Sequence, residues 1–289
     1  MAVNARIGQP VPVILPDPHT LFERRAARLD SLAAGHPMGD WLRFMARLAR
    51  AQRAAVAAFP AAATVAAAEG EPPLTHEAHR REPWWQAGLS ALLEATDDVA
   101  LPDRARMALG ALAAGTATEL EALADRCLRG DVRPAESGPA VFVAAALAAY
   151  FAHRAAALPI AQIHLLAQRG RCPVCGGVPV AGVVTAAGTA TGVRYLQCGL
   201  CATAWNHVRA VCTACGESRG LVLHGIEGGS DVVLAETCDE CRGYAKVLYQ
   251  ARDMAVEPMA DDLASLGLDM LVGEAGYHRH APNPLVIGG

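Results

Sequence analysis

The sequence lacks an excess of positive charge, and it has few aromatic residues. Its 289 residues include 25 Lys+Arg and 29 Asp+Glu, which gives a formal net charge of −4. A chain of this charge has no general positive field to attract nucleic acid or acidic lipid, so neither is an expected partner. Aromatic residues make up 5% of the chain, while alanine, valine and leucine dominate the 53% that is hydrophobic. This composition excludes a disordered or collagen-like chain, and the length is sufficient for two domains.

Segments that would direct the chain to a membrane are also lacking. The start, Met1 to Arg6, has no apolar stretch of the kind found in a secretory signal, so we expect a cytoplasmic protein. The longest uninterrupted apolar run, Ala140 to Ala152, has 13 residues, whereas a membrane-spanning helix needs about 20. A second alanine-rich stretch, Ala54 to Ala68, is interrupted by Pro60. Both stretches predict buried helices, and no membrane insertion is expected.

The alanine- and leucine-rich part of the chain before Arg171 predicts an all-α domain over residues 1–170. A first helix is marked by apolar residues at helical spacing, namely Phe22, Ala26, Leu29 and Ala33. Asp17 and Pro18 are its expected cap and first-turn residue, and Gly35 marks its end.

A second helix is expected from Asp40 until Pro60 stops it. One of its faces carries Trp41, Met45, Leu48 and Gln52, and the exposed face carries Arg43, Arg47, Arg50 and Arg53. Another helix is predicted over Trp84 to Ala95, and further ones begin near Pro102, Thr116 and Pro139. The region should therefore form a bundle of six to eight helices.

From Arg171 onward the composition changes to short valine- and glycine-rich segments that favour strands. The predicted strands are Val178 to Val184, Arg194 to Leu196, Val208 to Val211 and Leu221 to Leu223. After Tyr249, Glu257 and Pro258 are expected to open a last helix, with one face formed by Leu263, Leu266 and Met270. A proline-broken tail over residues 281–284 should pack against one of the domains.

Cysteines carry the strongest pattern in the sequence. Nine are present, and in a reducing cytoplasm a metal site or reactive thiols are favoured over disulfides. Eight of them form four C-x-x-C pairs, at Cys172, Cys175, Cys198, Cys201, Cys212, Cys215, Cys238 and Cys241. Adding 40 to the number of each of the first four gives the last four, and this alignment places Val183 over Leu223. The pattern predicts two similar modules, over residues 171–210 and 211–250.

A C-x-x-C pair forms a turn that points two thiolates at one ion while backbone amides donate to the sulfurs. Gly176 and Gly216 follow the first pair of each module and relax that turn, whereas Ala202 and Arg242 follow the second pairs. Two pairs joined by a hairpin-sized segment supply a tetrahedron of thiolates that suits Zn²⁺ or a single iron ion. Because a 40-residue module buries little apolar surface, the ion, at about 10–16 kcal/mol in comparable peptides, should nucleate its folding.

The way the pairs combine is open on spacing alone. Sequential pairing gives one ion to the first two pairs and one to the last two, while a crossed arrangement combines the first pair with the third and the second with the fourth. We favour sequential pairing, because a crossed arrangement gives no reason for the two halves to repeat. Spacing does not separate zinc from iron, and an iron–sulfur cluster fits the paired short turns less well than a single ion.

Other polar residues offer no stronger chemistry. We interpret His76, His79, His278 and His280 as surface histidines rather than extra ligands, while His207 either donates toward a ligand sulfur or lies on a strand. The adjacent acidic pairs Asp97-Asp98 and Asp261-Asp262 are interpreted as capping or solvated residues. Cys127 should be a small core residue on a helix.

Catalysis is not indicated, because four-thiolate sites leave no open position for water and no nucleotide-binding or acyl-transfer motif is present. Nucleic-acid binding, common among zinc ribbons, is disfavoured because residues 171–250 carry six basic and six acidic side chains. A protein that binds other proteins is therefore the better interpretation.

The runs Arg171-Cys172-Pro173-Val174-Cys175-Gly176 and Gln197-Cys198-Gly199-Leu200-Cys201 resemble the formate dehydrogenase accessory protein family, FdhE. The likeness extends to Leu15-Pro16-Asp17-Pro18, to Cys238-Asp239-Glu240-Cys241 and to Ala260-Asp261-Asp262-Leu263. It implies a cytoplasmic assembly factor that binds the catalytic subunit of formate dehydrogenase and is needed for its activity. It also implies rubredoxin-like sites that carry iron, with the eight cysteines as ligands and no turnover of the protein's own.

Together these observations predict an α+β multidomain protein. An N-terminal all-α bundle over residues 1–170 is followed by two tandem rubredoxin-like or zinc-ribbon modules and by a short C-terminal helix and tail over residues 251–289. The hypothesis is a non-enzymatic accessory factor whose two ions, iron or zinc, shape a surface for formate dehydrogenase. A rubredoxin-type electron carrier is the first alternative, and a nucleic-acid-binding zinc ribbon is the second.

Overall fold

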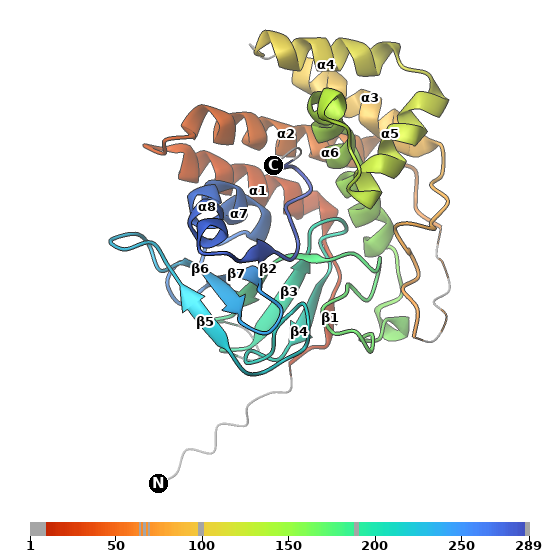
Figure 1. Ribbon diagram of the computed structural model, residues 1–289. Coiled ribbons are helices and arrows are strands. Elements are labelled where there is room, and N and C mark those ends of the chain that lie inside the picture. Colours follow the sequence, from red (N-terminus) through yellow and green to blue (C-terminus); the bar gives the residue numbers. More distant parts are fainter. Residues whose placement is uncertain are drawn as a thin grey trace.

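The structure is a computed structural model that describes residues 10–63, 65, 68, 70–97, 101–187 and 191–286. Figure 1 shows the helices of the first half of the chain on one side of a mixed β-sheet from the second half. One short helix from the C-terminal part, α7 (Pro258–Ala264), contacts both α1 and the sheet strand β2 (Pro179–Val184). The predicted α+β fold is therefore confirmed.

The first two helices follow the sequence signals closely. Helix α1 spans Pro18–Ala33, and the Asp17 side chain accepts a hydrogen bond from the amide of His19 at its start. Helix α2 spans Gly39–Ala58 and ends before Pro60 as expected, and the buried helix expected over residues 54–68 is confirmed only as far as Ala58. Its four arginines all lie on the exposed face, while Leu42, Met45 and Leu48 are buried. An amphipathic pattern thus placed both helices correctly.

Four further helices complete the N-terminal region within the described residues. They are α3 (Trp84–Asp97), α4 (Asp103–Ala114), α5 (Ala117–Arg129) and α6 (Ser137–Ala156), with single 3₁₀ turns at Pro134–Glu136 and Ile160–Gln162. Thr116 and Glu119 cap α5 reciprocally, as expected from a helix that begins there. By length and composition α6, extended back to Pro134, could cross a membrane, but 67% of its apolar window is buried inside the fold. The apolar run over residues 140–152 therefore lies in a buried helix, as predicted.

The β-sheet contains eight strands among the described residues. In chain order, the strands are β1 (Val13–Ile14), β2, β3 (Arg194–Cys198), β4 (Ala204–His207), β5 (Leu221–His224), β6 (Val233–Cys238), β7 (Gly243–Tyr249) and β8 (His278–Arg279). Their spatial order is β1-β4-β3-β2-β7-β6-β5, and β8 pairs with β7. The predicted strand over residues 208–211 is wrong, because the strand ends at His207 and a turn follows. Strand β1 shows that the region before Arg171 also contributes to the sheet.

Six of these eight strands form two copies of one three-stranded unit, β2-β3-β4 and β5-β6-β7. Strands β3 and β4 reappear 40 residues later as β6 and β7, with Leu196 opposite Trp205 and Glu236 opposite Ala245. The first strand of the unit slips by one residue: Leu196 faces Gly182, whereas Glu236 faces Leu223. A bulge between Pro179 and Ala181 accompanies this slip, so the alignment of Val183 with Leu223 is off by one residue in space.

The C-terminal segment forms two short helices rather than one. Helix α7 is capped by Glu257 and begins at Pro258 as predicted, but it ends at Ala264, and α8 spans Leu266–Glu274. The backbone carbonyls of Asp262 and Ser265 accept hydrogen bonds from Lys246 Nζ at 3.0 and 3.1 Å. The Lys246 amine therefore bonds to carbonyls that a continuous helix would use for its own backbone hydrogen bonds. Met270, expected on the apolar face, is consequently 68% exposed.

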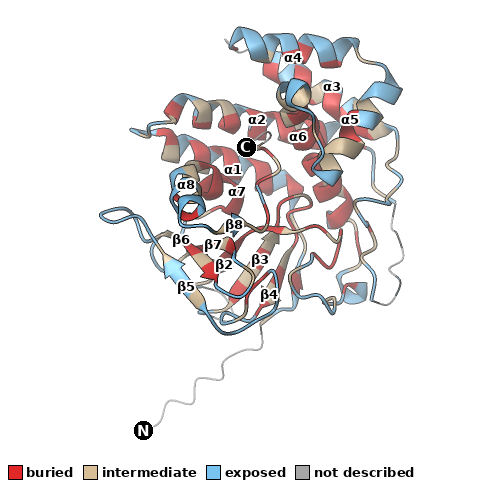
Figure 2. Ribbon diagram, in the orientation of Figure 1, coloured by how far each residue is buried: buried red, intermediate tan, exposed pale blue. Residues whose placement is uncertain are grey.

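One hydrophobic core joins the helical bundle to the first cysteine module (Figure 2). The loop before α3 lies against this module, with the amides of Leu74 and His76 donating to the carbonyls of Val174 and Cys175 at 2.9 and 3.0 Å. Trp205, which is fully buried, donates from Nε1 to the carbonyl of Arg169 at 2.8 Å. The first module is therefore embedded in the main body of the protein.

A half-buried polar cluster inside the bundle should make the stability of the protein depend on pH. His79 Nε2 lies 2.9 Å from the Tyr150 hydroxyl, and Tyr150 and Arg154 both contact the Glu82 carboxylate. Burial lowers the pKa of His79, Glu82 partly opposes this effect, and Arg154 and Arg81 reinforce it. The native protein therefore binds this proton less readily than the unfolded chain, in which a histidine has a pKa of about 6.5.

We expect this histidine to make the protein less stable in acid. Because the folded pKa is depressed, the stabilisation is present above pH of about 6.5 and is lost as the pH falls through the folded pKa, by at most about 1.4 kcal/mol per pH unit. In the His79→Gln variant, the free energy of unfolding should change less steeply with pH over this range. Urea unfolding of both proteins at several pH values between 5 and 8 measures the difference, and equal slopes would contradict the assignment.

Candidate metal centres

Eight cysteines gather into two separate clusters in the structure. In the first, Cys172 Sγ lies 3.5 Å from Cys201 Sγ, and Cys175 Sγ lies 3.4 Å from Cys198 Sγ. The second cluster holds the cysteines forty positions further along the chain, with the corresponding distances at 3.8 and 3.7 Å. All four sulfurs in each cluster lie within 4.8 Å of one another. Thiolates around a tetrahedral ion with metal–sulfur bonds of about 2.3 Å are about 3.8 Å apart, so both clusters match such an ion.

The clusters answer the question of pairing that spacing left open. One contains Cys172, Cys175, Cys198 and Cys201, and the other contains Cys212, Cys215, Cys238 and Cys241. The thiols therefore combine sequentially, and the crossed arrangement is not formed. The physical reason is the hairpin in each module, because it returns the end of β3 to the first pair of the first module and the end of β6 to that of the second.

Each first C-x-x-C pair is held by the same backbone turn. The amide of Gly176 donates to the carbonyl of Cys172 at 2.9 Å, and that of Gly216 donates to Cys212 at 3.1 Å. Both glycines have positive φ, at 71° and 81°, as their position after the pair predicts. At Gly177 a Cβ atom would lie 3.3 Å from Cys175 Sγ and 3.5 Å from Cys198 Sγ. Glycine thus keeps space beside the sulfurs.

The second pairs make a similar turn without glycine. Ala202 and Arg242 have φ values of 58° and 56°, and they are the two non-glycine residues with positive φ in the described ranges. A left-handed conformation costs such residues about 1–2 kcal/mol, so the rest of the module must hold it in place. The departure from glycine noted in the sequence therefore leaves the turn geometry intact.

Hydrogen bonding favours one thiolate in each cluster. Burial raises the pKa of Cys198, but the other three thiols and the amide of Cys201 donate to its sulfur and hold the pKa well below its usual range. Cys238 is the counterpart of Cys198 in the second cluster. Burial raises its pKa, but donation from the amides of Cys241 and Glu240 lowers the pKa overall. Backbone amides aimed at sulfur are a property of metal-binding cysteines. The donor set of both clusters therefore fits a thiolate-bound ion.

The two clusters differ in their access to solvent. All four cysteines of the first cluster are buried, because the loop before α3 covers one side and the C-terminal tail reaches the other, where Pro284 lies near Gly199. In the second cluster Cys215 is exposed and Cys241 is half-buried. Only the second site therefore contains a ligand cysteine that is exposed at the surface.

Among the described residues, no histidine joins either cluster. His76 is half-buried rather than on the surface, and its Nδ1 lies 2.8 Å from the carbonyl of Cys175, so it supports the first turn without touching sulfur. His207 lies on β4 with Nδ1 2.9 Å from the carbonyl of Val208, as the strand alternative predicted. His278 is exposed and His280 is half-buried. Thr203, which the sequence analysis missed, places its hydroxyl 3.2 Å from Cys201 Sγ.

The expectation of solvated acidic pairs is wrong for Asp261 and Asp262, which are both buried. Asp261 pairs with Arg28 of α1, and Asp262 accepts from Lys246, Arg279 and Asn283. These contacts tie α7 to the bundle and to the sheet, so the two carboxylates are structural. Asp97 is exposed at the end of α3, while Asp98 lies outside the described residues. Cys127 is half-buried on α5, and burial raises its pKa to about 12.

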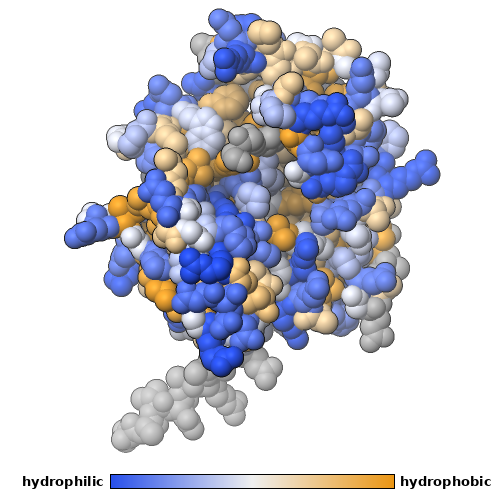
Figure 3. Space-filling view, viewed as in Figure 1, coloured by the Kyte–Doolittle hydropathy of each residue, from blue (hydrophilic) through white to orange (hydrophobic). Residues whose placement is uncertain are grey.

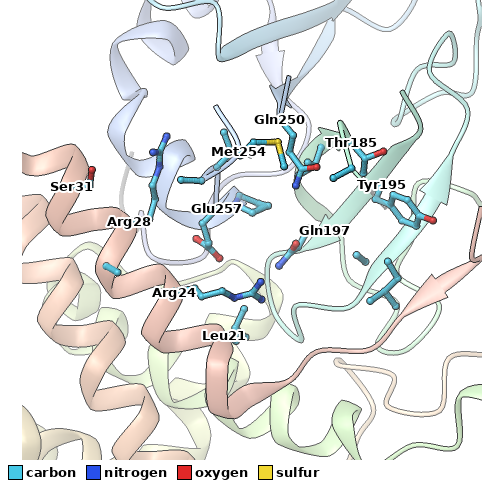
Figure 4. A pocket seen from close by; sticks show the side chains of 18 of the residues that line it. Leu21, Arg24, Arg28, Ser31, Thr185, Tyr195, Gln197, Gln250, Met254 and Glu257 are labelled. Carbon is cyan, nitrogen blue, oxygen red and sulfur yellow. The ribbon is translucent and has the colours of Figure 1, made fainter. Parts of the chain in front are cut away.

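A groove of about 710 Å³ lies between α1 and the sheet (Figure 4). Arg24 and Gln197 point toward its centre from opposite sides, Tyr195 lines its outer end, and Met254 and Gln250 border it near the end of β7. Its lining is mainly apolar and contains neither cysteine nor histidine.

Comparisons with known proteins agree with this architecture. Family models described as FdhE, N-terminal, FdhE, central domain, and FdhE, C-terminal domain match residues 10–167, 171–209 and 210–286. A protein named as an FdhE homologue in Edwardsiella ictaluri is 41% identical, with 99% of this chain and 94% of that protein covered. Protein FdhE of Escherichia coli K12 is 38% identical, with 96% and 92% covered.

A solved structure shows the same fold. The crystal structure of the FdhE protein from Pseudomonas aeruginosa superposes with a TM-score of 0.86 at 36% identity, covering 96% of this chain and 100% of that one. Both the sequence relatives and the fold extend over nearly the whole chain. The resemblance first carried by the paired cysteines is thereby confirmed, and this chain belongs to the FdhE family.

Proposed function

We propose that this protein is a non-catalytic cytoplasmic accessory factor that binds the catalytic subunit of formate dehydrogenase and is needed for its maturation or activity. Membership of the FdhE family supports the link to formate dehydrogenase. The observation that carries the non-catalytic role is the pair of four-cysteine clusters, because each offers a complete tetrahedral ligand set. A structural site of this kind stabilises a fold and leaves no position for substrate.

The eight cysteines would hold two ions, one in each cluster. A bound Zn²⁺ or iron ion joins the two turns of a module, and iron additionally supplies one-electron chemistry. The chain contributes the donor atoms and the amides aimed at Cys198 and Cys238. It also holds the helical bundle against the first module, through the contacts of Leu74 and His76. The ions and the bundle together would fix the shape of one binding surface.

A direct binding experiment tests this proposal. The chain is purified without oxygen, its metal content is measured by elemental analysis, and it is mixed with the purified catalytic subunit of formate dehydrogenase. We expect about two ions per chain, as the two clusters predict, and a complex that elutes together in size-exclusion chromatography. In cells that lack the gene, formate dehydrogenase activity should be low and should return with the wild-type chain and with Cys127→Ser, which alters a thiol outside both clusters.

Two results would contradict the proposal. One is the absence of any complex between the metal-loaded chain and the catalytic subunit. The other is normal formate dehydrogenase activity in cells without the gene. The metal analysis also separates the first alternative, since a colourless, zinc-loaded chain that supports full activity excludes an electron carrier that depends on reversible iron chemistry.

A further inference from the structure

The two repeated strand units are joined through the β2 edge of the first unit and the β7 edge of the second. The outer edge of β2, the first strand of the first unit, is covered by β7 of the second unit in a parallel pairing, with Gly182 opposite Val247 and Val183 opposite Leu248. The far edge of the same unit, β4, is covered by β1. Both edges of the first unit are therefore occupied by other strands of the chain.

The equivalent edge in the second unit is open. Strand β5 takes the place that β2 has in the first unit, and it is the last strand in the order of the sheet. Leu223 faces Glu236 on β6, just as Gly182 faces Leu196 on β3. Leu223 is therefore the equivalent of Gly182, the residue of β2 that pairs with β7. Within the described residues, β5 pairs with β6 alone. The fold thus repeats a strand-binding edge and leaves its second copy free.

The hydrogen-bonding groups at this edge follow from the register. The amide of Asp239 donates to the carbonyl of Gly220, which directs the backbone groups of Gly220 toward β6. Because these groups alternate along an antiparallel strand, the N–H and C=O of Leu221 and Leu223 point away from β6. Four backbone groups on a short strand are therefore available to an added strand.

Side chains on β5 do not protect the edge. Val222 and Leu223 are 45% and 47% exposed, and Ile226 in the following loop is 46% exposed. Figure 3 shows apolar side chains over β5 and the start of that loop, and Figure 2 shows β5 as an exposed strand of the sheet. Strand β5 contains no lysine, proline or acidic residue, although such residues normally discourage pairing at sheet edges. Both the backbone groups and the side chains of β5 therefore permit pairing with another strand.

We propose that β5 binds an extended, apolar segment of the formate dehydrogenase catalytic subunit as an additional strand, in the parallel orientation that β7 adopts beside β2. This inference rests on the proposed function and names its contact surface. Main-chain hydrogen bonds supply affinity in such strand addition, and pockets for alternate side chains supply specificity. A second copy of this chain fits less well, because identical edge strands related by a two-fold axis pair antiparallel.

The position of β5 also brings the bound segment close to the exposed metal site. Leu221 lies opposite Cys238, and β5 follows the turn that contains Cys215 by a few residues. A strand added to β5 therefore runs beside the one cluster that contains an exposed cysteine. The proposed binding surface therefore combines the free edge of β5 with the second cysteine cluster.

Hydrogen exchange in the complex tests the proposal directly. The metal-loaded chain is compared by mass spectrometry with and without the purified catalytic subunit. We expect the amides of Leu221 and Leu223 to exchange rapidly in the free chain, and the segment 221–224 to slow at least tenfold in the complex. A complex in which this segment exchanges as fast as in the free chain would overturn the proposal, and so would a free chain that is already a dimer with a protected β5.

Substitution at Leu223 provides a second measurement. Leu223→Pro removes an N–H that points away from β6, a change that edge strands accept, whereas Leu223→Ala keeps the N–H and shortens the side chain. Both variants should retain their ions. Affinity for the catalytic subunit should fall at least tenfold in Leu223→Pro and less in Leu223→Ala.

The outcomes distinguish this surface from the proposed function. Wild-type affinity in Leu223→Pro, together with an unprotected β5 in the complex, places the contact elsewhere while the accessory role stands. Failure of the wild-type chain to bind the catalytic subunit overturns both. If Leu223→Pro loses its ions or unfolds, exchange in the wild-type complex decides the question without it.

Discussion

Replacement of Cys175 by serine is expected to remove one ion and to unfold the first module together with much of the protein. All four cysteines of this cluster belong to the main hydrophobic core, and Cys175 is fully buried. A structural zinc contributes about 10–16 kcal/mol in comparable peptides, whereas a whole domain is stable by about 5–15 kcal/mol. Loss of the ion from this site therefore removes an amount of free energy comparable to the whole stability of a native domain.

The same change at Cys215 should have a local effect. Cys215 is exposed, and the second module shares a small hydrophobic cluster with α8, formed by Ala235, Tyr244, Leu268 and Val272. Cys215→Ser should lose one ion and disorder the turn and strand around it, while the helical bundle stays folded. The difference between the two variants reflects the burial of the sites and not their ligands, which are four thiols in both.

Metal content, far-ultraviolet circular dichroism and urea unfolding of both variants measure this contrast. Cys127→Ser serves as the control, because Cys127 lies on α5 outside both clusters, and it should retain two ions and nearly wild-type stability. Equal loss of helical signal in Cys175→Ser and Cys215→Ser would show that the two modules are not separate in stability. Retention of both ions in Cys175→Ser would remove that residue from the ligand set.

Replacement of Lys246 by methionine is expected to lower the free energy of unfolding by about 3–5 kcal/mol, the usual cost of removing one partner of a buried ion pair. Lys246 is the only lysine in the chain and is fully buried on β7. Its Nζ lies 3.1 Å from Asp262 Oδ1 and 2.6 Å from Asp269 Oδ2. It also donates to the carbonyls of Asp262 and Ser265 at the junction of α7 and α8.

Methionine is close to lysine in length but supplies neither charge nor donor. The two carboxylates would then keep the positive charge of Arg279, which contacts both, but lose that of Lys246, and the two carbonyls would lose a buried partner. Urea unfolding compares Lys246→Met with Arg252→Met, which removes an exposed pair with Asp231 and should cost no more than about 1 kcal/mol. A Lys246→Met protein within about 1 kcal/mol of wild type would show that the cluster carries little net stabilisation.

Local patterns predicted much of the helical region and of the metal sites. Asp17 and Pro18 placed the start of α1, Thr116 placed the start of α5, and Glu257 with Pro258 placed the start of α7. These signals are reliable because capping and first-turn geometry depend on a few adjacent residues. The cysteine spacing and its repeat predicted two four-thiol clusters for the same reason, since each turn is local and each hairpin is short.

Other features depended on residues distant in the chain. Strands β6 and β7 were not singled out, and the break between α7 and α8 was missed because Lys246, which binds the carbonyls there, comes from a different element. The burial of Asp261 and Asp262 likewise depends on arginines from α1 and β8. Neither the charge of a residue nor its helical position reveals a partner that arrives from elsewhere in the fold.

By itself, the sequence determined the eight candidate ligands, their division into two repeated modules and the family resemblance, because spacing along the chain controls which thiols a short hairpin can bring together. The tertiary structure alone decided that the first cluster is sealed by the bundle while the second is open, and that β2 is covered while β5 is free. Two similar modules acquire different surroundings because only one of them lies between the helices and the other module, and burial depends on neighbours that a repeat does not encode.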